Sequence, residues 1–122
     1  MRATMGVNIN DGEAPFTQMI LDGEKTVETR RSRSLDSVVG KRVGLVRTGC
    51  GPATLVGYAT VGEPIRYSNT DEFRSEYHRH RVPKGSSHDC DGAGKWGYPL
   101  LNVERAEARV IESRGIVLRR LR

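Results

Sequence analysis

The residues best suited to chemistry stand together near the N-terminus, in the stretch GEKTVETR. Within six positions this stretch places an ammonium group, a carboxylate and a guanidinium at Lys25, Glu28 and Arg30. If the stretch is extended, its side chains alternate between two faces, so Thr26, Glu28 and Arg30 share one face. Val27 then lies on the opposite face, where it can anchor the core. We therefore expect a short strand with a polar, reactive side and an apolar side.

A lysine and a carboxylate that share a cleft can exchange protons. Burial lowers the pKa of a lysine, while a nearby carboxylate raises it again. Such a balance can make Lys25 a base or nucleophile and Glu28 a proton shuttle, with the Thr26 hydroxyl orienting substrate or water. Arg30 can bind phosphate or carboxylate through two parallel hydrogen bonds. The same residues also fit a solvated edge strand whose charges merely pair with one another.

Further candidate residues for ligand binding are arginines and aromatic residues. Arginine suits phosphate and stacks on bases, and three arginines lie together at Arg30, Arg31 and Arg33. Trp96 and Tyr98 share a face of any extended segment, so both can stack on a base or both can fill the core. The arginines also fit a role in solubility and surface ion pairing.

The histidines and one cysteine raise the question of a metal. They are His78, His80, His88 and Cys90, whose spacing fits no standard zinc pattern. We expect no metal site and no cofactor.

Length and composition limit the class of protein. A chain of 122 residues is one domain with a modest core. No apolar run approaches the roughly 20 residues of a membrane span, and the first residues lack the apolar segment of a signal peptide. We therefore expect a cytoplasmic protein without a membrane partner. The formal net charge of +5 favours an anionic partner such as RNA or a nucleotide.

The elements that must position these residues are mostly short strands. Alternating apolar residues predict strands at 1–9, 40–47, 53–65, 96–103 and 105–113, beside the strand of the reactive stretch. Helical spacing predicts a helix at 14–21 and another from Asn69 or Thr70 to about His80. Together they indicate an α+β fold, a small and mostly antiparallel β-barrel with two or three short helices packed against it. We expect one domain over residues 1–113 and a basic C-terminal tail over 114–122.

The spacing Gly23-x-Lys25-x-x-Glu28-x-Arg30 resembles the GxKxxExR signature of the ASCH domain, a branch of the PUA-like superfamily. The stretch also follows a helix and precedes a strand, as in that family, and the segment from Trp96 onward resembles its late strand. The likeness covers most of residues 14–112. It implies a PUA-like barrel, which agrees with the fold that the element pattern indicates.

The resemblance also implies two kinds of function. The first is binding of RNA or a modified nucleotide in a cleft lined by Lys25, Glu28 and Arg30, where an aromatic residue such as Trp96 stacks on the base. The second is hydrolysis in the same cleft, because some ASCH proteins deacetylate N4-acetylcytidine with the signature lysine and others cut single-stranded RNA. In the deacetylating branch the position of Glu28 is typically threonine, so this chain departs from that branch there.

Overall fold

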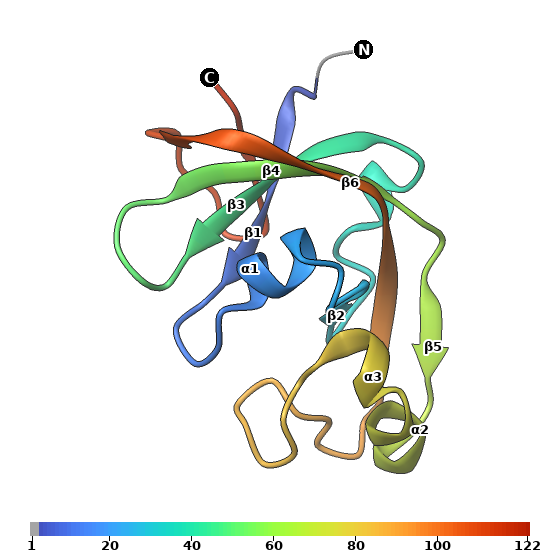
Figure 1. Ribbon diagram of the computed structural model, residues 1–122. Coiled ribbons are helices and arrows are strands. Elements are labelled where there is room, and N and C mark those ends of the chain that lie inside the picture. The colour runs from blue at the N-terminus through green and yellow to red at the C-terminus, as the bar shows by residue number, and fades with distance from the viewer. Residues whose placement is uncertain (1–2) are drawn as a thin grey trace.

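The structure, a computed structural model, describes residues 3–122. Within that range the chain forms seven strands and three short α-helices, arranged as a strongly curled sheet (Figure 1). The strands are β1 (Met5–Asn10), β2 (Val27–Arg30), β3 (Arg42–Thr48), β4 (Thr54–Val61), β5 (Ile65–Tyr67), β6 (Lys95–Val110) and β7 (Leu118–Arg120). The helices are α1 (Phe16–Leu21), α2 (Thr70–Ser75) and α3 (Tyr77–His80), with a 3-10 turn at Asp36–Val38.

The sheet is mixed but mostly antiparallel, in the order β2-β6-β4-β3-β1-β7, and β5 also pairs with β6. Only β1 and β3 run parallel among the described pairs. The 16-residue strand β6 connects two parts of the sheet. It pairs with β2 and β5 near its start and with β4 further along. The expected α+β fold, a small antiparallel barrel with short helices, is confirmed.

The boundaries of several elements differ from the expected ones. The two strands expected at 96–103 and 105–113 are one strand, β6, which turns at Asn102, a residue with a φ of 50°. The strand expected at 53–65 is divided into β4 and β5, since Pro64 cannot donate to a ladder. The helix expected up to His80 breaks at Glu76, and Asn69 caps its first part by accepting a hydrogen bond from the Glu72 N–H at 2.9 Å.

The core fills the inside of the curl. It contains apolar side chains from β1, β3, β4 and β6 and from α1, which lies inside the curved sheet (Figure 1). Val27 is fully buried, as expected for the apolar side of β2. A second, smaller cluster is formed by Val46, Leu55, Ile111 and Leu121.

The chain ends return to the sheet. Residues 114–122 were expected as a basic tail of undecided conformation, and part of them forms β7, which pairs antiparallel with β1. The first two residues of the strand expected at 1–9 lie outside the described residues. In the described part of the chain, no helix has the length and apolar character needed to cross a membrane.

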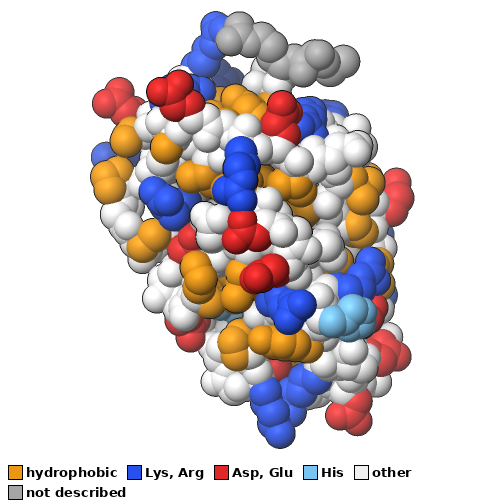
Figure 2. Space-filling model, viewed as in Figure 1, with side chains coloured by type: hydrophobic (Ala, Val, Ile, Leu, Met, Phe, Trp, Pro, Cys, Tyr) orange, Lys and Arg blue, Asp and Glu red, His pale blue; other side chains and the backbone are white. Residues whose placement is uncertain are grey.

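Charges are mixed on the surface. Figure 2 shows basic side chains interspersed with acidic ones on the face it displays, with apolar atoms between them. The net positive charge therefore defines no single interface on that face, and the hollows of the molecule are more informative.

Candidate functional site

Lys25 is carried by the tight turn that connects α1 to β2. The turn uses Gly23, whose φ of +82° is open to glycine at little cost, and the Lys25 N–H donates to the Met19 carbonyl at 3.1 Å. The lysine side chain is directed inward and is only 2% exposed. Its Nζ donates to the His80 carbonyl at 2.5 Å and lies 4.6 Å from the centre of the Phe16 ring. Burial lowers the pKa of Lys25, and the nearby Glu28 carboxylate partly opposes that shift.

Glu28 lies between two cations. Its Oε1 is 3.6 Å from Lys25 Nζ, and its Oε2 accepts a hydrogen bond from Arg30 Nη2 at 2.9 Å. The same Arg30 nitrogen donates to the Asn8 carbonyl of β1 at 2.7 Å. Because β2 and β1 belong to different parts of the sheet order, this contact joins them across the seam that the curled sheet leaves open.

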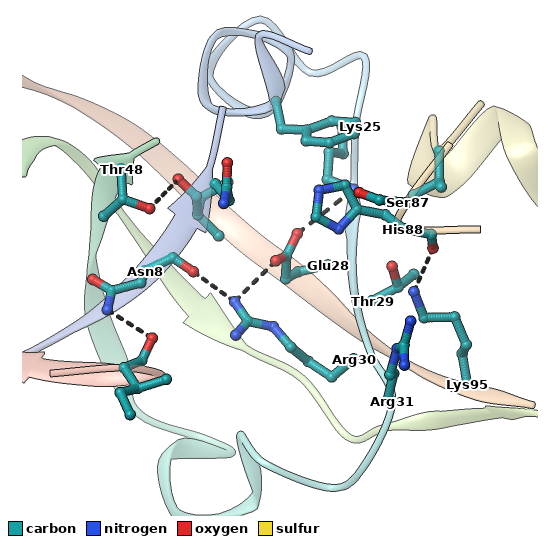
Figure 3. A pocket seen from close by; sticks show the side chains of 15 residues that line it. Asn8, Lys25, Glu28, Thr29, Arg30, Arg31, Thr48, Ser87, His88 and Lys95 are labelled. Carbon is teal, nitrogen blue, oxygen red and sulfur yellow. Dashed lines mark hydrogen bonds and ion pairs between the residues drawn. The ribbon is translucent and has the colours of Figure 1, made fainter. Parts of the chain in front are cut away.

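A cavity of about 280 Å³ opens at this seam. Figure 3 shows the side chains of Lys25, Glu28 and Arg30 converging on it from β2 and the preceding turn. Two further cationic residues, Arg31 and Lys95, line the cavity, so it holds four cations and one carboxylate. A hollow with this balance attracts anions and groups rich in hydrogen-bond acceptors.

The loop before β6 and the first residue of β6 form the other wall of the cavity. Lys95 is buried, its ammonium donates to the His88 carbonyl, and burial lowers its pKa. The His88 ring contacts the Phe16 ring edge-on, with centroids 5.9 Å apart, and its Nε2 lies 3.4 Å from a carboxylate oxygen of Glu13. Phe16 and His88 therefore supply the aromatic surfaces of the cavity.

His80 supports the site from behind. Its Nδ1 accepts a hydrogen bond from the Val82 N–H at 2.9 Å, so the proton is on Nε2, which donates to the Phe73 carbonyl at 2.6 Å. The ring also stacks on Phe73 with centroids 4.1 Å apart. Burial lowers the pKa of His80 to about 4, so the imidazole is neutral and holds in place the backbone that binds Lys25.

Several residues named from the sequence lie away from the cavity. Thr26 is exposed, and it contributes its backbone, which bonds to Arg79 and Leu100. Arg33 pairs with Asp36 at 2.6 Å. Neither side chain lines the cavity.

The two aromatic candidates also lie elsewhere. The Trp96 ring lies near two guanidinium groups, with Arg33 5.1 Å and Arg66 5.0 Å from its centre. Tyr98 is fully buried and donates to Asp36 at 2.6 Å, and its burial raises its pKa to about 12. The structure thus brings together Lys25, Glu28, Arg30 and Arg31 but not the aromatic pair.

The relation to known proteins is one of shape. No protein-family model matches the chain, and no curated protein matches it in sequence. Among solved structures, the crystal structure of ASCH from Zymomonas mobilis superposes with a TM-score of 0.68 and 14% identity, over 88% of this chain and 73% of that one. The chain has the ASCH fold.

Two variants of the Zymomonas mobilis ASCH protein show the same likeness. A variant with tyrosine replaced by phenylalanine gives a TM-score of 0.71 and 16% identity, over 91% of this chain and 78% of that one. A variant with serine replaced by alanine gives 0.73 and 18%, over 97% and 87%. The family resemblance of the GEKTVETR stretch therefore agrees with the three-dimensional fold.

Sequence reasoning missed part of the wall of this ASCH-fold cavity. Phe16 belongs to the core as its helical spacing indicates, but it also lines the cavity, while His88 is a candidate metal ligand or phosphate contact by sequence and Lys95 lies in an expected loop. The one available signal was that Lys95 directly precedes the segment from Trp96 that resembles the late ASCH strand. Within residues 3–122, no three histidine, cysteine, aspartate or glutamate side chains come together as a metal-ion cluster.

Proposed function

We propose that this ASCH-fold protein binds RNA or a nucleotide through the cavity lined by Lys25, Glu28 and Arg30. The observation that carries the proposal is the charge of the cavity, four cations against one carboxylate, in a partly enclosed hollow. Guanidinium and ammonium groups pair with phosphate oxygens, and enclosure strengthens these interactions by excluding water.

The size of the cavity supports a small ligand unit. Its volume of about 280 Å³ is close to the lower end of small-molecule sites, about 300 Å³. One nucleoside with its phosphate matches that size better than a stacked pair of bases. In this proposal Arg31, which is exposed at the rim, meets the phosphate, and Glu28 accepts hydrogen bonds from an amino group of the base.

The test uses mononucleotides, which are small enough for the cavity. Titrating cytidine and adenosine monophosphate into isotope-labelled protein at low salt should shift the backbone amide signals of residues 25–31 and 87–95. Arg31→Ala should weaken binding, and added salt should weaken it further, because phosphate pairing is screened. Arg114→Ala, which removes an exposed arginine outside the cavity, is the matched control. Absence of salt-dependent shifts in these segments would reject the proposal.

A hydrolase is the second candidate, and the specific observation in its favour is the environment of Lys25. Its pKa is lowered by burial, and a carboxylate lies 3.6 Å from its ammonium group. A neutral Lys25 would take a proton from a water molecule as that water attacks an acyl carbon, and would return the proton to the leaving amino group. Glu28 would hold the charged form of the lysine between these two transfers. Thr26 is exposed, so we assign the proton transfers to Lys25 and the stabilisation of its charged form to Glu28.

Turnover decides between binding and hydrolysis. The protein is incubated with N4-acetylcytidine and, separately, with end-labelled single-stranded RNA, and products are followed by chromatography and gel electrophoresis. Lys25→Met keeps the length of the side chain but removes the amine. Turnover that disappears in Lys25→Met supports the hydrolase, whereas no turnover, or equal turnover by both proteins, leaves ligand binding as the function.

A further inference from the structure

A second hollow lies on the outer side of the sheet, and we call it the outer groove. It has a volume of about 810 Å³ and shares no lining residue with the cavity at the seam. Its walls come from strands at both ends of the chain and from the middle of the sheet. The side chains that matter for its chemistry are Arg42, Tyr58, Glu104, Arg109, Arg120 and Arg122.

Two glycines seat Leu121, one of the residues that line the groove. Gly6 of β1 and Gly44 of β3 are paired in register, and they alternate with core residues, so they face the outer side. A Cβ on Gly6 would lie 2.8 Å, and one on Gly44 2.9 Å, from a methyl group of Leu121. Leu121 packs into the space that the two glycines leave, and it is 4% exposed.

The burial of Leu121 positions charged residues at the groove. Its neighbours Arg120 and Arg122 are exposed on either side of it and line the groove. Arg109 reaches the same place from β6, and its Nη1 donates to the Leu121 carbonyl at 3.1 Å. Arg42 is held by Glu104 at 2.6 Å, the only carboxylate side chain in the described lining. Three arginines therefore face the groove beyond the one that is already paired.

Tyr58 adds an aromatic surface next to these arginines. It lies opposite Gly44 on β3 and opposite Glu104 on β6, and it is only partly buried against the outer cluster of apolar residues. Because its partner on β3 is a glycine, the ring has no directly opposite side chain on that strand. A ring beside guanidinium groups is the combination that single-stranded nucleic acids use, with stacking for a base and arginine for the phosphates.

We propose that the outer groove is a second nucleic-acid-binding surface, which takes a short single-stranded segment. Arg109, Arg120 and Arg122 pair with its phosphates, and one base stacks on Tyr58. The groove is about three times as large as the seam cavity, 810 against 280 Å³, so it suits several nucleotides where the cavity suits one. This surface does not depend on whether the cavity binds a nucleotide.

The test measures binding of a fluorescently labelled oligouridylate of about eight nucleotides by anisotropy, over a series of salt concentrations. Arg120→Ala/Arg122→Ala should weaken binding on the order of tenfold and should lower the slope of log affinity against log salt by about 1.4, since each phosphate contact on a single strand contributes about 0.7. The matched control is Lys84→Ala/Arg114→Ala, which removes the same charge from exposed positions outside the groove. This control should bind within about twofold of the unchanged protein.

A second variant tests the aromatic part. Tyr58→Leu keeps apolar packing against the outer cluster but removes the ring, and it should weaken the oligouridylate by at least several-fold. Far-ultraviolet circular dichroism confirms that each variant is folded. The proposal is supported if both groove variants lose affinity while the control double Lys84→Ala/Arg114→Ala retains it.

Three results would overturn the proposal. The first is that the oligouridylate shows no salt-dependent binding. The second is an equal loss of affinity in the groove variant Arg120→Ala/Arg122→Ala and the control variant Lys84→Ala/Arg114→Ala. The third is displacement of the RNA by polyglutamate at equal charge concentration. The last result would point to an acidic peptide as the occupant. Failure of mononucleotides to bind the cavity would leave these outcomes unchanged, so the two proposals fail separately.

Discussion

Lys25 keeps an ammonium group in the interior because three kinds of partner replace the lost water. These partners are the His80 carbonyl, the Glu28 carboxylate and the face of the Phe16 ring. Desolvation still outweighs them, which is why the pKa of Lys25 is lowered. At the scale of single residues, the site is therefore a buried charge whose protonation is coupled to its neighbours.

The pH dependence of stability should reveal this coupling. The pKa of Lys25 is 10.5 when unfolded and lower in the folded protein, so between these values the unfolded state binds more protons. Its contribution therefore makes the protein more stable as the pH rises towards 10.5. Urea unfolding of the unchanged protein and of Lys25→Met is measured at a series of alkaline pH values. The free energy of unfolding of the unchanged protein minus that of Lys25→Met should rise with pH. Parallel curves would contradict the assignment.

His80 should control stability in acid. Its pKa falls from 6.5 to about 4 on folding, so its contribution is complete above pH 6.5 and is lost as the pH falls towards 4. With about 1.4 kcal/mol for each pKa unit, the loss is on the order of 3–4 kcal/mol. His80→Gln should flatten the unfolding free energy between pH 7 and about pH 4. His78→Gln, two positions away and exposed, should keep the slope of the unchanged protein.

At the scale of elements, β2 presents the site although it has only four residues. One edge of β2 is bonded to β6, and near the other edge Arg30 reaches the Asn8 carbonyl of β1. The apolar side is anchored by Val27, which packs against the space above Gly97 of β6. The position of Glu28 and Arg30 thus depends on how closely β2, β5 and β6 approach one another.

Gly97→Ala tests that close approach. A Cβ at Gly97 would lie 2.7 Å from the Tyr67 ring and 2.8 Å from a Val27 methyl group, so both must move. We expect a loss of about 1–3 kcal/mol in the free energy of unfolding, measured by urea denaturation. Ala108→Ser, on an exposed part of the same strand, should change it by less than about 0.5 kcal/mol. A neutral Gly97→Ala would mean that the three strands pack less tightly than described.

At the scale of the whole molecule, the last residues close the fold onto its first strand. β7 pairs with β1, and Leu121 completes the outer cluster with Val46, Leu55 and Ile111. The same seating positions the arginines of the outer groove. Stability and the proposed second surface are therefore linked through one apolar side chain.

Leu121→Ala should destabilise the protein by about 2 kcal/mol or more, because it removes a buried side chain and leaves a cavity over Gly6 and Gly44. Leu101→Ala is the control of the same residue type, since Leu101 is 48% exposed, and it should cost less than about 1 kcal/mol. Thermal unfolding monitored by circular dichroism compares the two. Equal melting temperatures of the two variants would show that residues 118–122 contribute no more to stability than an exposed strand does.

The sequence determined by itself those features that depend on local pattern. Alternation of apolar residues indicated most strands, the spacing of Phe16, Met19 and Ile20 indicated α1, and Asn69 was one of two expected caps. The GEKTVETR stretch contains Lys25, Glu28 and Arg30, which line the seam cavity, and its resemblance to the ASCH signature indicated the fold. These inferences hold because strand alternation, helix spacing and capping act over only a few residues.

Only the tertiary structure decided which polar and aromatic side chains meet. Trp96 and Tyr98 lie two positions apart, so strand alternation predicts that they share a face. In the structure Trp96 contacts two surface arginines, whereas Tyr98 packs in the core. His88 and Leu121 acquire their places from neighbours more than 70 residues away in the chain, Phe16 and Gly44 respectively. These long-range contacts depend on how strongly the sheet curls and where its seam lies, and the local sequence pattern does not determine that curvature.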